Sequence, residues 1–166
     1  IAELAVVDPV ITLTLPPKVT ATTGMDALSH AIEPLLTINS NPLAEAVALQ
    51  AIDLIFRNIR IAYNHGNNLE ARSNMAYAAT LGGLALNSGG SWAHSFSYTV
   101  SSRFKIPHGL GCAIGLPYSM ELNLYPKAKN LAKIAQAAGQ DVKGITTIEA
   151  AYKAVSAVKS LLEDLQ

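Results

Sequence analysis

The chain has 166 residues, half of them apolar, and twelve basic side chains balance twelve acidic ones. This balance excludes the basic surface that binding to nucleic acid or an anionic membrane requires, and the apolar share is enough for one compact core. Cys112 is the single cysteine, which excludes an internal disulfide and a thiolate cluster, favours a reducing cytoplasm and restricts metal ligands to nitrogen and oxygen.

The two ends of the chain indicate a piece of a longer protein. Residues 4–8 are predicted to form one β-strand, and no partner strand follows it in the sequence. Because a lone strand cannot satisfy its own backbone hydrogen bonds, we expect its sheet to lie upstream. The last predicted helix ends at Gln166 without a cap, which indicates a truncated C-terminus. Apolar stretches such as residues 109–117 are too short to span a bilayer, and no leader pattern is present, so we expect a soluble protein.

The rest of the chain shows the apolar spacing of helices. The first helix is predicted to begin near Val19 or Gly24, after paired prolines, and to fade over residues 36–40. Asn41 and Pro42 suit the N-cap and first turn of a second helix. The predicted helices after the first cover residues 43–63, 69–86, 92–102, 107–123, 126–138 and 146–165. Gly66 is expected to cap the second helix, and the small residues of the third should let neighbouring helices approach closely. The sequence therefore predicts an all-α domain of about seven helices preceded by an orphan strand.

Asp26 and His30 are four residues apart in the first predicted helix, so their side chains lie on one face and can chelate a metal. The pattern alone is weak, since such a pair is more often an exposed charged pair, and Asp26 could instead close a capping box with Thr23. The flanking residues are apolar, however, which favours a buried pair that needs a partner such as a metal ion.

His94 and His108 complete the candidate cluster, because they lie in segments that are otherwise poor in charge and able to pack together. Each histidine alone would more often be structural, and His108 could simply bond the loop before its helix. His65 lies in a polar helix terminus and is left out as a solvated residue. One carboxylate and three imidazoles suit Fe(II) or Zn(II), between which the sequence does not choose.

Two longer stretches carry a family resemblance. The segment DPVITLTLPPKVTATTGMDALSHAIE, from Asp8 to Glu33, resembles the signature of iron-containing alcohol dehydrogenases, and so does FKIPHGLGCAIGLP, from Phe104 to Pro117. The similarity continues through Asn41-Pro42, residues 70–75 and Asn87, and it thins beyond about residue 123. By this resemblance, the family's metal ligands correspond to Asp26, His30, His94 and His108.

The resemblance implies a domain organisation. Family members have an N-terminal α/β domain, which binds NAD or NADP through a Gly-Gly-Gly-Ser loop, and a C-terminal helical domain that resembles the helical domain of dehydroquinate synthase. Residues 1–18 would then be the last strand and linker of the missing first domain, and residues 19–166 the helical metal-binding domain. Taken alone, the chain is expected to bind metal without turning over alcohol.

One position departs from the family pattern. Many members carry a further histidine four residues after the third ligand, and this sequence has Tyr98 there. Tyr98 is the candidate catalytic residue, since its hydroxyl could orient substrate or relay a proton, although its ordinary pKa of about 10 makes it a weaker base at neutral pH. The run from His94 to Arg103 resembles a subgroup that acts on small aldehydes. Arg103 could contact an anionic substrate, but an exposed helix-end arginine is the more ordinary interpretation.

The resemblance implies hydride transfer between a small primary alcohol and NAD or NADP, with the metal polarising the substrate oxygen. Two alternatives remain open at this point. A zinc-dependent lyase could use a related dehydroquinate synthase-like domain, although no further carboxylate or histidine base accompanies the four ligands. A non-catalytic remnant could use its exposed small-residue and leucine faces to form a homo-oligomer.

Overall fold

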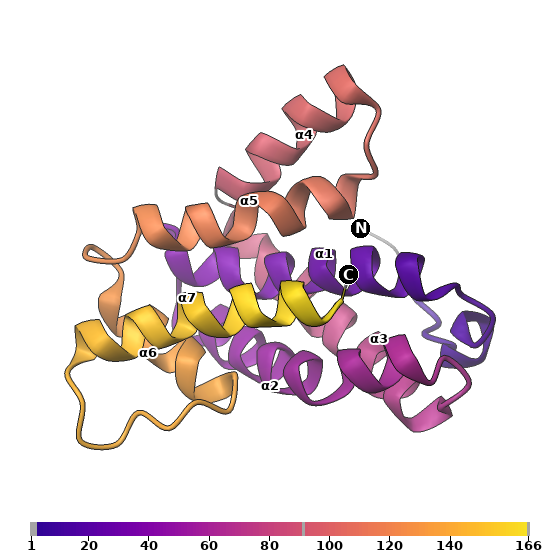
Figure 1. Cartoon of the computed structure of the whole chain (residues 1–166), viewed down its shortest axis with the longest axis horizontal. Helices are drawn as coiled ribbons and strands as arrows, with labels where there is room; N and C mark the ends of the chain where they lie inside the picture. Colours follow the sequence, from indigo (N-terminus) through magenta and orange to yellow (C-terminus); the bar gives the residue numbers. More distant parts are fainter. Residues whose placement is uncertain (1–2, 91, 166) are drawn as a thin grey trace.

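The computed structural model describes residues 3–90 and 92–165, and within these ranges it is entirely helical. Seven α-helices are present, as the sequence predicts, together with two short 3-10 helices (Figure 1). The elements are η1 (Pro9–Thr12), α1 (Pro17–Leu36), α2 (Pro42–Asn64), α3 (Leu69–Ala85), η2 (Leu86–Ser88), α4 (Trp92–Phe104), α5 (His108–Leu122), α6 (Ala128–Ala137) and α7 (Thr147–Asp164). No helix in these ranges is both long enough and apolar enough to cross a membrane.

The strand predicted over residues 4–8 is not formed, and this part of the prediction is corrected. These residues have no regular secondary structure, and the first ordered element is η1, whose N-cap Asp8 accepts a hydrogen bond from the Val10 N–H. Leu4 is 81% exposed, so nothing in the described chain covers it. An extended segment without a neighbouring strand has no partner for its backbone groups, which explains why its β-type composition is not enough.

Local chemistry explains where several helices begin. α1 starts at Pro17, earlier than predicted, because proline at the first position already holds a helical φ and lacks the N–H that would be unpaired there. Asn41 caps α2 as expected, by accepting a hydrogen bond from the Ala44 N–H. α7 begins with a reciprocal capping box between Thr146 and Glu149. α2 ends at Asn64 with His65 as the C-cap, and Gly66 does not take the left-handed conformation of a glycine cap.

α1 lies at the centre of the molecule and contacts α2, α3 and α5 along its length. Its buried apolar face meets the buried faces of α2 and α5, and the fully buried side chains include Leu28, Ile32, Leu35, Ile52, Ile55, Ile59, Leu116 and Met120. The predicted close approach of the third helix is confirmed at Gly82, where an added Cβ would lie 3.1 Å from the Ala27 carbonyl oxygen.

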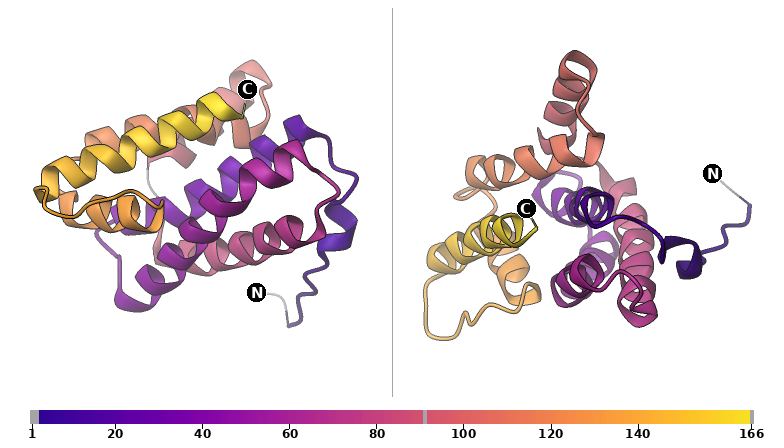
Figure 2. Two further views of the ribbon diagram at one scale, coloured as in Figure 1. Left: turned by 60° about the horizontal axis from the view of Figure 1, so that its bottom comes forward. Right: turned by 45° about the vertical axis from the view of Figure 1, so that its right-hand side comes forward.

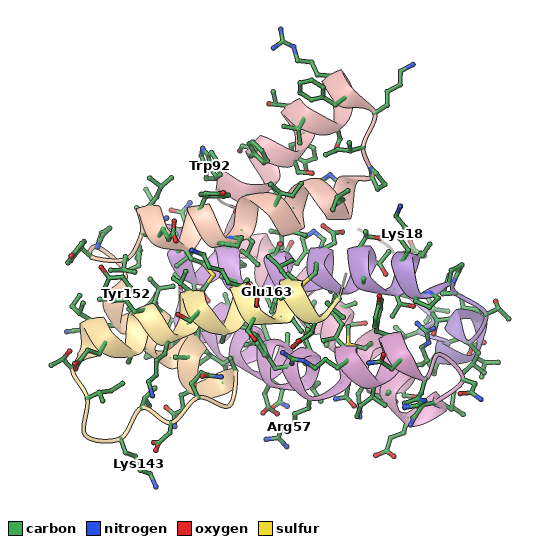
Figure 3. The ribbon with its side chains drawn as sticks, viewed as in Figure 1. Lys18, Arg57, Trp92, Lys143, Tyr152 and Glu163 are labelled. Carbon is green, nitrogen blue, oxygen red and sulfur yellow. The ribbon has the colours of Figure 1, made fainter. Side chains whose placement is uncertain are left out.

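α4 is packed differently from the other long helices. It packs mainly on α5, and its far end stands away from the helical body (Figures 1 and 2). Trp92 lies at the end of α4 that adjoins α5 (Figure 3), whereas Phe104 at the other end is 70% exposed. Only the first turns of α4 are therefore held against α1 and α5, and these turns carry His94.

Candidate metal centre

Three helices bring the predicted metal ligands together. Asp26 and His30 lie one turn apart in α1, His94 lies in the first turn of α4, and His108 is the first residue of α5. The Asp26 Oδ1 atom is 3.6 Å from the His94 Nε2 atom and 3.5 Å from the His108 Nε2 atom. Side chains separated by more than 80 residues in the sequence thus meet at one carboxylate oxygen.

Cys112 joins this cluster, which the sequence analysis missed. One ligand atom from each of Asp26, His94, His108 and Cys112 lies within 4.8 Å of the others. The Cys112 Sγ atom is 3.5 Å from the His108 Nε2 atom, and the cysteine is fully buried. The sequence restricted metal ligands to nitrogen and oxygen because it contains no second cysteine, but one thiol can still join a mixed site. The signal was the spacing of His108 and Cys112, which are four residues apart on one helix.

His30 lies beside this set without being part of it. Its ring stacks on the His94 ring, with centroids 4.6 Å apart and an interplanar angle of 19°. The four-residue spacing from Asp26 therefore brings His30 to the site, as predicted, but through ring contact with His94. The set in which every ligand atom is mutually close has Cys112 in the place that the sequence analysis gave to His30.

Both remaining histidines are oriented through their Nδ1 atoms. The Ser97 hydroxyl donates to the His108 carbonyl oxygen at 2.7 Å and lies 3.0 Å from His108 Nδ1. Since that hydroxyl has only one proton, it accepts the second bond, and His108 Nδ1 is the donor. For His94, the partner of Nδ1 is the Glu33 carboxylate. The Nε2 atoms of both rings are thereby turned toward Asp26.

The centre of the cluster contains unpaired polar atoms. Three buried side-chain atoms in the described chain lack a hydrogen-bond partner, namely Asp26 Oδ1, His94 Nε2 and Ser101 Oγ. Two of them face each other at this site, at a separation too long for a hydrogen bond. Two ligand atoms that each lie about 2.0 to 2.2 Å from a shared ion are separated from each other by distances comparable to the 3.5 and 3.6 Å found here. The residues therefore fit a divalent metal ion, which would satisfy both orphaned atoms.

Burial and charge interactions together shift the pKa values of three residues in the cluster. Burial alone would lower the pKa of His94, but its contacts with Asp26, Cys112 and Glu33 outweigh burial and raise the pKa to about 12. Burial opposes ionisation of Asp26, yet the neighbouring imidazoles, His94 first, lower its pKa. For His30, burial lowers the pKa despite the Asp26 charge. His30 is thus neutral at pH 7, which is the form that binds metals.

Two glycines in the first turn of α5 permit the close packing that forms the cluster. A Cβ on Gly109 would lie 2.2 Å from the Thr22 carbonyl oxygen in α1, and a Cβ on Gly111 would lie 2.5 Å from the Ser97 hydroxyl in α4. The Thr22 carbonyl belongs to the backbone of α1, and the Ser97 hydroxyl is fixed by its contacts with His108, so neither can move aside for a Cβ without disturbing the packing. The absence of both side chains allows His108 to reach Asp26.

The other sequence-predicted residues have clear positions. Tyr98 is 64% exposed and stacks on His108 with ring centroids 5.2 Å apart, so it lies at the solvent edge of the cluster. Arg103 is exposed in the last turn of α4, and His65 is exposed at the end of α2, as their ordinary interpretations expect. The Thr23–Asp26 capping box is wrong, because both residues lie inside α1 and Thr23 donates to the Val19 carbonyl oxygen.

Comparison with known proteins agrees with this class of fold and site. The Fe-containing alcohol dehydrogenase family, C-terminal, matches residues 20–166. The chain is 38% identical over 164 residues to 1,3-propanediol dehydrogenase of Klebsiella pneumoniae, which covers 98% of this chain and 42% of that protein. It is 40% identical over 166 residues to choline dehydrogenase of Bacillus subtilis, covering 99% of this chain and 41% of that protein.

A solved structure of 1,3-propanediol oxidoreductase superposes with a TM-score of 0.94 at 39% identity, covering 95% of this chain and 42% of that one. The all-α fold is therefore that of an alcohol dehydrogenase helical domain. The chain belongs to the Fe-containing alcohol dehydrogenase family, and it spans about two fifths of the length of the relatives that it matches.

Proposed function

We propose that this chain is the metal-binding helical part, residues 19–166, of an NAD- or NADP-dependent alcohol dehydrogenase or aldehyde reductase. The observation that carries the proposal is the buried pair of unpartnered atoms, Asp26 Oδ1 and His94 Nε2, at the meeting point of three helices. Neither atom has a hydrogen-bond partner in the described chain, and a bound cation would give both of them one. Family membership makes Fe(II) the first candidate, with Zn(II) as the second.

We assign the ligands as Asp26, His30, His94 and His108. Asp26 supplies the negative charge, and the three imidazoles supply neutral donors. His30 lies one turn after Asp26 on the same face of α1 and stacks against the His94 ring, so it borders the proposed ion site. Cys112 is assigned as a buried neighbour of the ligands.

The substrate side of the cluster is the exposed side, where Tyr98 stacks on His108. When bound, a divalent ion supplies Lewis-acid polarisation of a substrate oxygen, and a nicotinamide cofactor supplies the hydride chemistry. Tyr98 can orient a small alcohol or aldehyde with its hydroxyl, and the buried wall formed by Ala93, His94 and Cys112 excludes water from the far side. Relatives named for 1,3-propanediol, long-chain alcohols, methanol and choline support an alcohol as the substrate class.

Metal analysis tests this proposal. We expect the full chain, purified and reconstituted anaerobically with Fe(II) or Zn(II), to hold one ion per chain. Asp26→Asn should weaken binding at least about 100-fold, since loss of a direct ligand exceeds the effect of an outer contact. Asp53→Asn is the matched control, because Asp53 pairs with Arg57 on the surface of α2, far from the cluster.

Elemental analysis gives the number of ions per chain, and competition titration against a chelator gives the binding affinity. A chain that binds no ion and stays equally stable in chelator contradicts the proposal and favours the non-catalytic alternative. In the complete protein, NADH or NADPH oxidation with small aldehydes tests the reaction, and a metal-loaded protein without turnover on any of them contradicts it.

A further inference from the structure

Glu33 is a fully buried carboxylate that the sequence analysis did not select. It lies in α1 with no exposed surface, among apolar neighbours such as Ile32 and Leu36. Both of its oxygens are used by the first turn of α4. Oε1 accepts a hydrogen bond of 2.7 Å from the Ala93 N–H, and Oε2 is bonded to His94 Nδ1.

The start of α4 offers a favourable place for a buried negative charge. The N–H groups of a first helical turn are unpaired within the helix and carry the positive end of its dipole. One of these N–H groups, that of Ala93, is satisfied by Glu33. The second partner is the His94 ring, and the ion pairs of the described residues give Glu33 no lysine or arginine. Both of these partners of the carboxylate belong to the first turn of α4.

This pair of bonds fixes the orientation of the His94 ring. With Nδ1 bonded to Glu33, the other ring nitrogen, Nε2, is directed at Asp26 Oδ1, 3.6 Å away, and has no hydrogen-bond partner in the described chain. A carboxylate that accepts a hydrogen bond from the Nδ1–H of a metal-binding histidine holds the ring in one orientation and increases the basicity of the ligating nitrogen. The Ala93 bond adds a second point of attachment, which ties the same carboxylate to the backbone beside His94.

We propose that Glu33 is a positioning residue for the metal centre, which holds His94 with Nε2 available to the ion through its bidentate contact with the start of α4. The inference rests on the metal site proposed above. Glu33 touches neither the ion nor the substrate, and its whole effect passes through His94. Ser97 makes the corresponding contact to His108, but with a neutral hydroxyl.

The test is Glu33→Gln in the full chain, with zinc affinity as the first readout. A glutamine side chain replaces one of the two accepting oxygens with an NH2 group, which can only donate, so the position that accepts from Ala93 or the one that accepts from His94 Nδ1 is lost. We expect a 10- to 100-fold loss of affinity, the usual effect of removing an outer-shell partner. Ser29→Ala is the matched control, because Ser29 is equally buried one turn earlier in α1 and bonds only to the Met25 carbonyl oxygen. It should bind zinc as the wild type does.

Nitrogen-15 NMR of the zinc-loaded protein gives a second readout, which reports the protonation of the His94 ring directly. We expect His94 to carry its proton on Nδ1, with a strongly deshielded resonance that moves toward ordinary values in Glu33→Gln. A proton on Nε2, or unchanged zinc affinity in a folded Glu33→Gln chain, overturns the inference while the metal site stands. A wild-type chain that binds no zinc overturns the metal site and this inference together.

Discussion

Two buried polar clusters, both built on α1, differ in how completely the protein satisfies them. Arg72, in α3, is 4% exposed, and each of its three guanidinium nitrogens has an acceptor in the chain. Nε donates to the Gly66 carbonyl, one terminal nitrogen to the Thr20 hydroxyl and the other to the Leu15 carbonyl, at 2.7 to 3.1 Å. The Asp26 cluster, further along α1, leaves a carboxylate oxygen and an imidazole nitrogen without hydrogen-bond partners.

The difference separates a structural polar group from a binding site. Burial of Arg72 is compensated by fixed acceptors, so this guanidinium ties the segment before α1, α1 itself and the loop before α3 to α3. In the Asp26 cluster, the surrounding contacts orient each ring but leave the central atoms open. A cluster that is well anchored at its edge and unsatisfied at its centre is the arrangement expected of a ligand site.

The largest expected effect on stability comes from the closed cluster. Arg72→Met keeps much of the side-chain volume but leaves two carbonyl oxygens and a hydroxyl without their donors. At one or more kcal/mol for each lost charged hydrogen bond, we expect the free energy of unfolding to fall by about 3 kcal/mol. Metal affinity of the folded chain should be unchanged, because Arg72 makes no contact with the Asp26 cluster.

Chemical denaturation measures the free energy of unfolding, and Arg57→Met is the control variant. Arg57 extends outward from α2 (Figure 3) and makes a surface pair with Asp53, with 74% of its side chain exposed. Its loss should change stability by no more than about 0.5 kcal/mol. Equal effects of the two substitutions would show that the Arg72 bonds contribute no more than a surface ion pair.

The second expected effect concerns pH and applies only to the open cluster. The folded-state pKa of His94 is raised from 6.5 to about 12, so in the metal-free chain its stabilising contribution is complete below pH 6.5 and is lost as pH rises toward 12. The pKa of Asp26 is lowered from 3.8, so its contribution is present above that value and is lost as pH falls through the lowered pKa. Between these limits, both charges stabilise the metal-free fold.

A metal ion must displace the His94 proton, so metal binding should become stronger as pH rises. We expect the apparent zinc affinity to increase about tenfold for each pH unit between about 6.5 and 8.5. Chelator competition at several pH values, corrected for the chelator's own protonation, measures the slope. A flat profile would mean that His94 is already neutral in the metal-free chain, and the contrast with the Arg72 cluster would then rest on geometry alone.

The sequence predicted what depends on local pattern. Helical periodicity and the cap at Asn41 placed most helix ends within a few residues, and the spacing of Asp26 and His30 placed both on one face of α1. No strand is formed over residues 4–8, because a strand needs a neighbouring strand for its backbone hydrogen bonds and the local sequence does not show whether one is present.

Glu33 and Cys112 were missed for a related reason. Glu33 lies seven residues after Asp26, two turns along the same face, but an acidic residue there is also compatible with an exposed position. Only the approach of α4, which brings Ala93 and His94 to its carboxylate, shows that it is buried. For Cys112, counting cysteines excluded a thiolate cluster but could not exclude one sulfur beside two histidines. Whether each residue takes part in the site depends on how α1, α4 and α5 pack against one another.

The smallest expected effect decides between His30 and Cys112 as the fourth ligand. If the ion is held by Asp26, His30, His94 and His108, Cys112→Ser should change metal affinity less than about threefold, whereas His30→Ala, which removes a direct ligand, should weaken it at least about 100-fold. The two substitutions are well matched, since both residues border the same rings. Cobalt(II) substitution adds a direct readout, because a bound thiolate gives an intense near-ultraviolet charge-transfer band and nitrogen or oxygen ligands do not. We expect no such band in the wild type. A band that disappears in Cys112→Ser would assign the sulfur to the ion and give the site the mixed nitrogen, oxygen and sulfur character that favours zinc over iron.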